Sequence, residues 1–226
     1  MKALTAKITA AFALALMVFN ASAVYIYNNS VNDQTNRLSA TDNLWFGDEV
    51  VLSTNNTQRF MTAFDFQVWA TNTSTLTIDI ELRLNNGTPY NGYATPGTLV
   101  YAYSGLALSD TVRSTINFNA ADLDAYDGVS DGGTLLSLDN ITLAVRFHLA
   151  GGGTAGVDLY NPPVEGSGYL DYWQFNGSSW QLTTNNVFGN VNFGMTIQAV
   201  PEPSVFSIFI MAGMMALGFR RFFGKK

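Results

Sequence analysis

Apolar side chains at every second position constrain the fold of this chain more than any other sequence feature. The clearest stretch places them at Leu76, Ile78, Ile80, Leu82 and Leu84. Because successive side chains of a strand point to opposite faces, this pattern predicts a strand with one buried and one solvated face. The same alternation predicts strands over 60–68, 112–118, 141–149 and 191–197, and more weakly over 24–27, 50–53, 99–103, 169–175 and 179–182.

The segments between these stretches are rich in Asn, Gly, Asp and Ser, which are typical turn residues. No comparable stretch of the central region has an apolar stripe at helical spacing. About ten short strands in one body predict an all-β fold, a two-sheet antiparallel β-sandwich of jelly-roll type. We expect residues 24–199 to form this single domain.

Charge is unevenly distributed along the chain. Between Val24 and Ala199 there are 5 Arg and 16 acidic residues, a formal charge of −11, whereas all four Lys lie in the termini. Such a body repels nucleic acid and anionic lipid, and it suits cations, neutral sugars or simple solubility. The chain has no Cys, which excludes a thiol nucleophile and Cys-ligated metals.

The first 23 residues are typical of a secretory signal peptide. Lys2 and Lys7 give a positive start, 8–19 is a short apolar run, and Ala21-Ser22-Ala23 has the small residues that signal peptidase requires. The run is shorter than the roughly 20 apolar residues of a transmembrane helix. We therefore predict an N-terminal signal helix, export, and cleavage after Ala23.

The last 27 residues contain three features in a fixed order. The segment 200–204 (Val200, Pro201, Glu202, Pro203, Ser204) is stiffened by two prolines, which favours an exposed, extended backbone. An uncharged stretch, 205–219, predicts a short transmembrane helix. Cations close the sequence at Arg220, Arg221, Lys225 and Lys226, and they predict that this end stays cytoplasmic while the body lies outside.

This tail resembles the PEP-CTERM sorting signal, also known as the ice-binding protein C-terminal domain family. The resemblance rests on the Pro-Glu-Pro segment, the apolar stretch with Gly213 and Gly218, and the basic end. It implies processing by an exosortase near Pro201–Pro203, a transient inner-membrane anchor, and association with exopolysaccharide or biofilm at the cell surface. A tail that is never cut, acting as a permanent anchor, is the competing interpretation. The body also resembles exported PEP-CTERM proteins of unknown role, through Gly47-Asp48-Glu49 and Leu159-Tyr160-Asn161-Pro162-Pro163, and this implies no catalytic residue.

Enzyme chemistry has weak candidates. His148 is the single histidine, and no Gly-x-Ser-x-Gly nucleophile motif accompanies it. Asp79 and Glu81 share one predicted strand face, roughly 7 Å apart, close to the spacing of glycosidase carboxylates. Arg83 shares that face, however, which favours a solvated ladder of charges. The sequence therefore favours a non-enzymatic protein without a resident cofactor.

Calcium is the candidate ion. Asp122, Asp124, Asp127 and Asp131 fall within ten residues among turn-forming glycines, and oxygen ligands on a flexible loop suit calcium. The spacing differs from that of an EF-hand, and a solvated acidic turn is the competing interpretation.

Sugar binding is the alternative function that the residues suggest. The aromatic stretch 169–180 contains Tyr169, Tyr172, Trp173, Phe175 and Trp180, interspersed with Asp171, Gln174 and Asn176, and its leading candidates are Tyr172, Trp173 and Trp180. Aromatic faces stack on sugar rings, while amides and carboxylates bind hydroxyls. Because β-sandwiches also use Trp and Tyr in their cores, core packing remains the competing role.

Overall fold

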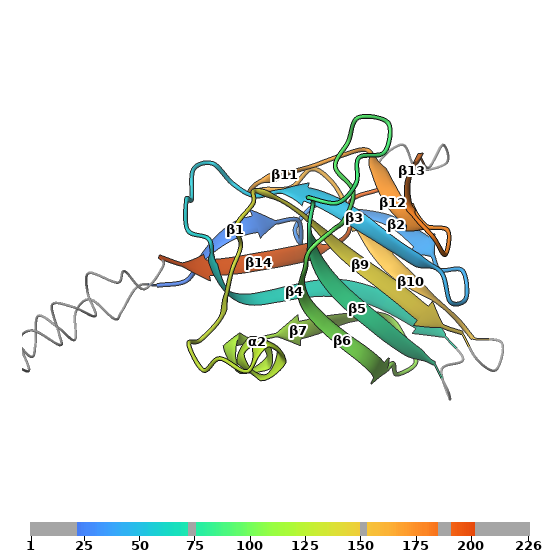
Figure 1. Cartoon of the computed structure of the whole chain (residues 1–226). Coiled ribbons are helices and arrows are strands. Elements are labelled where there is room, and N and C mark those ends of the chain that lie inside the picture. Colours follow the sequence, from blue (N-terminus) through green and yellow to red (C-terminus); the bar gives the residue numbers. More distant parts are fainter. Residues whose placement is uncertain (1–21, 72–75, 150–152, 185–190, 202–226) are drawn as a thin grey trace, which may run out of the picture.

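Alternating side chains give the long strands one apolar face each, and these faces bury one another between two sheets. The computed structural model describes residues 22–71, 76–149, 153–184 and 191–201. Within these ranges the chain is mostly β, with two antiparallel sheets that cross one another and one short helix, consistent with a β-sandwich (Figure 1). The predicted all-β class and two-sheet architecture are therefore confirmed.

The first sheet, called sheet I, contains the strands nearest both ends of the described chain. Its order is β1-β14-β4-β10-β2, and β7 and β8 also pair with β4. The bounds are β1 Val24–Asn28, β14 Met195–Val200, β4 Phe60–Thr71, β10 Thr154–Tyr160, β2 Asp33–Ser39, β7 Thr111–Phe118 and β8 Thr134–Leu135.

The second sheet, sheet II, has the order β13-β12-β3-β9-β5-β6, with β11 pairing with β3. The bounds are β13 Trp180–Thr184, β12 Asp171–Phe175, β3 Trp45–Val51, β9 Asn140–His148, β5 Thr77–Leu84, β6 Leu99–Ala107 and β11 Ser167–Gly168. The clearest predicted strand is thus β5, and it lies between β9 and β6 near one edge of the sheet.

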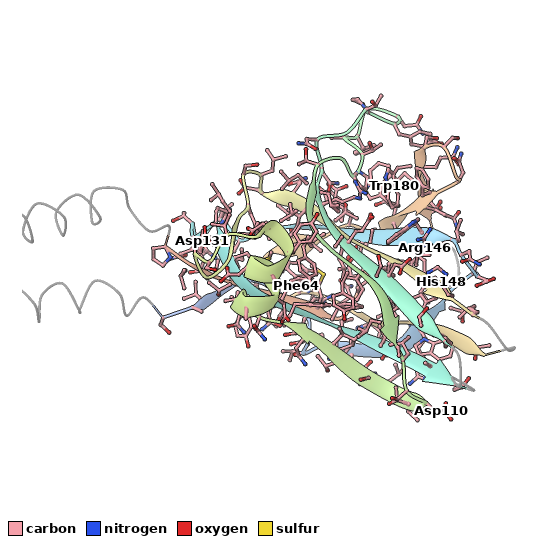
Figure 2. The ribbon with its side chains drawn as sticks, turned by 60° about the horizontal axis from the view of Figure 1, so that its bottom comes forward. Phe64, Asp110, Asp131, Arg146, His148 and Trp180 are labelled. Atoms are coloured by element: carbon pink, nitrogen blue, oxygen red, sulfur yellow. The ribbon has the colours of Figure 1, made fainter. Side chains whose placement is uncertain are left out.

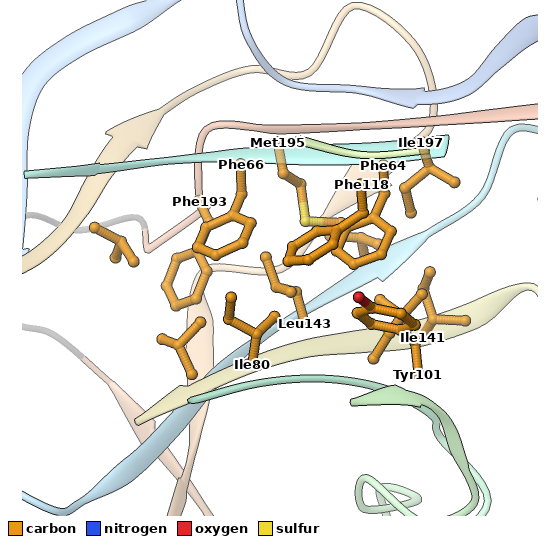
Figure 3. Packing of buried hydrophobic residues seen from close by; sticks show 14 of the residues in the cluster. Phe64, Phe66, Ile80, Tyr101, Phe118, Ile141, Leu143, Phe193, Met195 and Ile197 are labelled. Carbon is orange, nitrogen blue, oxygen red and sulfur yellow. The ribbon is translucent and has the colours of Figure 1, made fainter. Parts of the chain in front are cut away.

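The core lies between the sheets (Figure 3). Sheet I contributes Phe64 and Phe66, which are 3% and 0% exposed, and sheet II contributes Ile80 and Leu143, both fully buried. Phe64 stacks on Phe118 of β7 with ring centroids 4.8 Å apart. Burial of this apolar area is the main favourable term for folding, at about 25 cal/mol per Å².

A helix, α2 (Ala120–Asp127), lies within the body that was predicted to consist of strands and turns. Its capping box joins Asn119 and Asp122, and Gly128 ends it with a left-handed φ of 75°. The helix buries a single residue, Leu123, and Tyr126 packs on Tyr101 of β6 with ring centroids 5.3 Å apart. So short a helix has no repeated apolar stripe to predict it.

Four strands of the described ranges also lie outside the predicted set, namely β2, β10 and the two-residue strands β8 and β11. The edge strand β2 is polar and mostly exposed, so its sequence carries no apolar alternation. The strand β10 is buried at six of its seven positions, and it pairs with β4 on one side and β2 on the other. The predicted strand over 191–197 is shifted along the chain, because β14 begins at Met195 and continues to Val200, with only an isolated bridge from Phe193 to Leu159 before it.

Candidate functional site

The outward face of sheet II carries a row of aromatic and charged side chains that crosses the strands. On one side of β12, Phe175 pairs with Trp180, and on the other side it pairs with Trp45. Trp45 in turn pairs with Arg146, and Arg146 pairs with Asp79. Directly paired residues of antiparallel strands point to the same face. These five residues therefore form one line across β13, β12, β3, β9 and β5.

Alternation along the strands places this row on the outside. Phe46, Val145 and Ile80 are core residues, so Trp45, Arg146 and Asp79 next to them point away from the core. Trp180, Phe175 and Trp45 are all partly exposed, and we call these three residues the aromatic row. Phe175 and Trp180 pack with ring centroids 5.3 Å apart. Figure 2 shows Trp180, Arg146 and His148 along the same side of the molecule.

Arg146 joins the aromatic row to the charged end of the line. Its guanidinium lies 4.8 Å from the centroid of the Trp45 ring, a cation–π contact. Its Nη2 and Nε donate to Oδ2 of Asp79 at 2.6 and 3.0 Å. This pairing holds both the guanidinium and the Trp45 ring in place.

Asp79 is the most enclosed charged group of the row, only 4% exposed. Burial acts to raise its pKa, but hydrogen bonds from Arg146, His148 and the Gly105 amide outweigh burial and lower the pKa below its usual value. His148 contacts Asp79 Oδ2 through Nε2 at 2.8 Å and Asn43 Oδ1 through Nδ1 at 2.6 Å. Glu81 accepts a hydrogen bond from Arg83 Nε at 2.6 Å. The candidate carboxylates and the histidine are thus bound in ion-pair and hydrogen-bond networks.

The three aromatic residues singled out for sugar binding have different environments. Trp173 is fully buried, and its Nε1 donates to Glu49 Oε2 at 2.9 Å. Tyr172 packs against the hydrophobic core and points inward. Only Trp180 has an outward, partly exposed ring, so the structure corrects the expected grouping: Trp173 and Tyr172 have packing roles, and Trp180 belongs to the aromatic row.

Phe175 lies in the predicted sugar-binding stretch 169–180, whereas Trp45 was not among the predicted sugar-binding residues. Trp45 lies more than a hundred residues before Phe175 in the sequence. Phe175 lies in a predicted strand, but Trp45 begins β3 five residues before the strand that was predicted over 50–53. Their meeting depends on the register of three strands, which a single sequence does not specify.

The outward face of sheet I provides a comparison. The fully buried Asp158 pairs with Arg37 (Nε–Oδ1 3.0 Å) and Arg113 (Nε–Oδ2 3.3 Å). Arg37 also lies 5.4 Å from the Trp69 ring centroid. This face thus repeats the stacked arginine and enclosed aspartate of sheet II, with Arg37 over Trp69 and Arg113 5.5 Å from the Tyr160 ring centroid in place of the aromatic row.

A polar group is buried between the sheets. Asp48 is fully buried, and its Oδ2 accepts a hydrogen bond from the Phe193 amide at 2.7 Å. Asn29 donates through Nδ2 to the carbonyls of Phe193 and Tyr160, both at 3.0 Å. Burial raises the pKa of Asp48 well above its usual value. These bonds connect β3 of sheet II to the chain segment before β14 of sheet I.

The four aspartates of the predicted calcium loop lie on and after α2, so the expected flexible loop is partly helical. Asp122 accepts a hydrogen bond from the amide of the N-cap residue Asn119 at 2.8 Å, and Asp124 accepts hydrogen bonds from the amides of Gly132 and Gly133 at 2.9 and 3.1 Å. Asp127 accepts from the Val129 amide at 2.8 Å, and Asp131 is exposed at the same end of the molecule (Figure 2). No three acidic or histidine side chains gather as a metal site in the part of the chain that the structure describes. Calcium binding stays a prediction.

Most of the terminal signals lie outside the described residues. These include Ala21, Glu202, Pro203, Ser204, the stretch 205–219 and the cations Arg220, Arg221, Lys225 and Lys226. Of the signal motifs, the structure places Ala23 just before β1, Val200 at the end of β14, and Pro201 just after it. Among the described ranges, no helix is both long and apolar enough to cross a membrane.

Comparison with known proteins places the chain in no family. No protein-family model matches it, and no curated protein matches it. One solved structure, of the infectious bursal disease virus Gt strain, aligns with a TM-score of 0.34 and 12% sequence identity. The alignment covers 82% of this chain and 38% of the viral chain, and a similarity this low supports no conclusion about fold or function.

Proposed function

We propose that this protein is an exported, non-enzymatic surface protein whose β-sandwich binds an extracellular polysaccharide on the outward face of sheet II. One observation carries the binding role: Trp180, Phe175 and Trp45 form a continuous, partly exposed aromatic row beside Arg146. Aromatic surfaces stack on the apolar faces of sugar rings, and a guanidinium donates hydrogen bonds to hydroxyls. The site combines both on strands whose positions are fixed by pairing.

Support for a non-enzymatic role comes from the partners of the charged groups. Asp79 is held by Arg146 and His148, and Glu81 is held by Arg83. A glycosidase requires one carboxyl group that stays protonated near neutral pH. The lowered pKa of Asp79 disfavours that role.

Export and sorting form the second part of the proposal. The signal-like 1–23 and the Pro-Glu-Pro tail support export, exosortase processing and a transient inner-membrane anchor. Val24 pairs with Ala199, so the leader and the tail adjoin the sandwich at one common point. We also assign the sandwich to the jelly-roll type, because strands near the start pair with strands near the end: β1 with β14, β2 with β10 and β3 with β9.

Binding is tested by calorimetric titration of the purified protein with a panel of neutral and acidic polysaccharides. Trp45→Ala and Trp180→Ala should each weaken binding by about tenfold or more, a loss of about 1.4 kcal/mol. Trp69→Ala is the matched control, since that ring also stacks with an arginine but lies on sheet I. Equal losses in all three variants, or binding by none of the polymers, would contradict the proposal.

Sorting is tested by the intact mass of the protein recovered from cells and medium. Cleavage after Ala23 and loss of the residues following the Pro-Glu-Pro segment should both appear in the mass. A mature protein that retains Lys226 would instead indicate a permanent anchor.

A further inference from the structure

The geometry points to a neutral, linear polysaccharide as the ligand, lying perpendicular to the strands of sheet II along the aromatic row. This inference rests on the proposed glycan-binding role and specifies its substrate class and direction.

The shape of the site favours an extended chain over a single enclosed sugar. The three rings lie on three adjacent strands, β13, β12 and β3, which are spaced about 4.8 Å apart in a sheet. The apolar surface is therefore elongated across the strands. A hollow of about 240 Å³ lies elsewhere, between 51–55 and 164–167 at the far end of β3 from Trp45. A ligand on the aromatic row thus contacts an open strip and can continue past either end.

The charge around the row favours a neutral polymer. Arg146 is paired with Asp79 and Arg83 with Glu81, so both cations of this face are offset by carboxylates. Asp171 lies on the same outward face, because it alternates with the inward Tyr172 on β12. No excess positive charge remains for a polymer with a carboxylate on every repeat, and the acidic body repels such a polymer at long range.

Arg146 also supplies the polar component of recognition. Its Nε and Nη2 are used on Asp79, and a guanidinium has five N–H donors in all. The remaining donors lie beside the Trp45 ring, where the hydroxyls of a sugar stacked on the row would be. Neutral hydroxyls accept such hydrogen bonds without adding net charge to the face.

The test titrates the purified protein with cello-oligosaccharides and with laminari-oligosaccharides of increasing length, and with polygalacturonate as the acidic polymer. We expect at least one neutral series to bind with affinity that rises from the disaccharide until the oligomer spans the row. Raising NaCl from about 0.05 to about 0.5 M should change this affinity less than twofold, because no net charge is neutralised. Polygalacturonate should bind at least about tenfold more weakly.

The outcomes separate this inference from the function on which it rests. If polygalacturonate binds more tightly than both neutral series and Trp180→Ala abolishes that binding, the proposed binding site is supported but the inference of a neutral ligand is wrong. If a disaccharide binds as tightly as a hexasaccharide, the extended mode is wrong. If none of the polymers binds, or if Trp69→Ala weakens binding as much as Trp180→Ala does, the proposed function itself fails.

Discussion

Replacing Trp173 with alanine should lower the free energy of unfolding far more than replacing Trp180, which lies in the same hairpin. Both rings point to the outward face of sheet II, which for most sheets is the solvated side. Trp173 is nevertheless fully buried, and its indole N–H donates to Glu49. It is opposite Gly47 on β3, whereas Trp180 pairs with Phe175 near the end of the hairpin.

The size of the effect follows from these environments. A tryptophan buries about 200 Å², which at about 25 cal/mol per Å² is worth roughly 5 kcal/mol as an upper estimate. Measured losses for large aromatic residues replaced by alanine in cores are about 3–5 kcal/mol. The change also leaves the half-buried Glu49 without the indole donor. We therefore expect Trp173→Ala to cost about 4 kcal/mol, and Trp180→Ala about 1 kcal/mol because that ring is partly exposed.

Urea unfolding followed by tryptophan fluorescence and circular dichroism measures both costs. For a domain of 150–250 residues, about 4 kcal/mol corresponds to a fall in Tm of roughly 8–16 °C. Trp180→Ala should lower Tm by only about 2–4 °C and keep a native circular dichroism spectrum. Equal losses in the two variants would refute the assignment of Trp173 to packing and Trp180 to the exposed row.

Three further changes test the charged and close-packed positions. Asp79→Asn should lower the free energy of unfolding, measured by urea titration, by about 2 kcal/mol at pH 7 and by less at pH 3. The lowered pKa of Asp79 stabilises the native state at neutral pH, and this stabilisation is lost as the pH falls below about 4. An equal loss at both pH values would contradict this. Because its pKa is raised, Asp48 keeps a proton in the native state that the unfolded chain releases above about pH 4, so the Tm of the unmodified protein should fall between pH 5 and pH 7. Asp48→Asn should make this fall smaller. An unchanged dependence of Tm on pH would contradict the prediction. Gly47→Ala should lower the free energy of unfolding in urea titrations by about 1–3 kcal/mol. An added Cβ would lie 2.7 Å from Thr142 Cγ2 and 2.9 Å from the Leu143 carbonyl oxygen. An unchanged free energy of unfolding would show that β9 moves aside.

Alternation made the strongest strands predictable. The stretches around Phe64, Ile80 and Leu143 have their large apolar residues on one face, because that face of each sheet meets the core. The edge strand β2 has no such pattern, since neither of its faces is deeply buried. In β10 the alternation of Ala155, Val157 and Leu159 is consistent with a strand, but it gives no sign that Asp158 between them is buried as well.

Asp158 and α2 illustrate what local sequence does not reveal. Asp158 is fully buried because Arg37 from β2 and Arg113 from β7 both reach it, and neither is near it in the sequence. The helix could have been predicted from its ends, since Asn119 and Asp122 have the spacing of a capping box and Gly128 follows. Its eight residues carry too little apolar periodicity for the usual signal.

The candidate site was predictable only in part. Trp180 was identified from its polar and aromatic neighbours, but Trp173 and Tyr172, next to each other on β12, could not be sorted by sequence into packing and binding roles. Trp173 points outward and is still buried, so alternation alone would have exposed it. The aromatic row exists because β13, β12 and β3 pair in one register, and that register depends on the whole sheet.

A crystal structure of the protein with a neutral tetrasaccharide at saturating concentration tests the role of the aromatic row most directly. The sugar rings should lie across the strands over Trp180, Phe175 and Trp45, with hydroxyls within hydrogen-bond distance of Arg146. A tetrasaccharide bound along a single strand, over Trp69 on sheet I, or anywhere that leaves the aromatic row uncovered would contradict the proposed binding site.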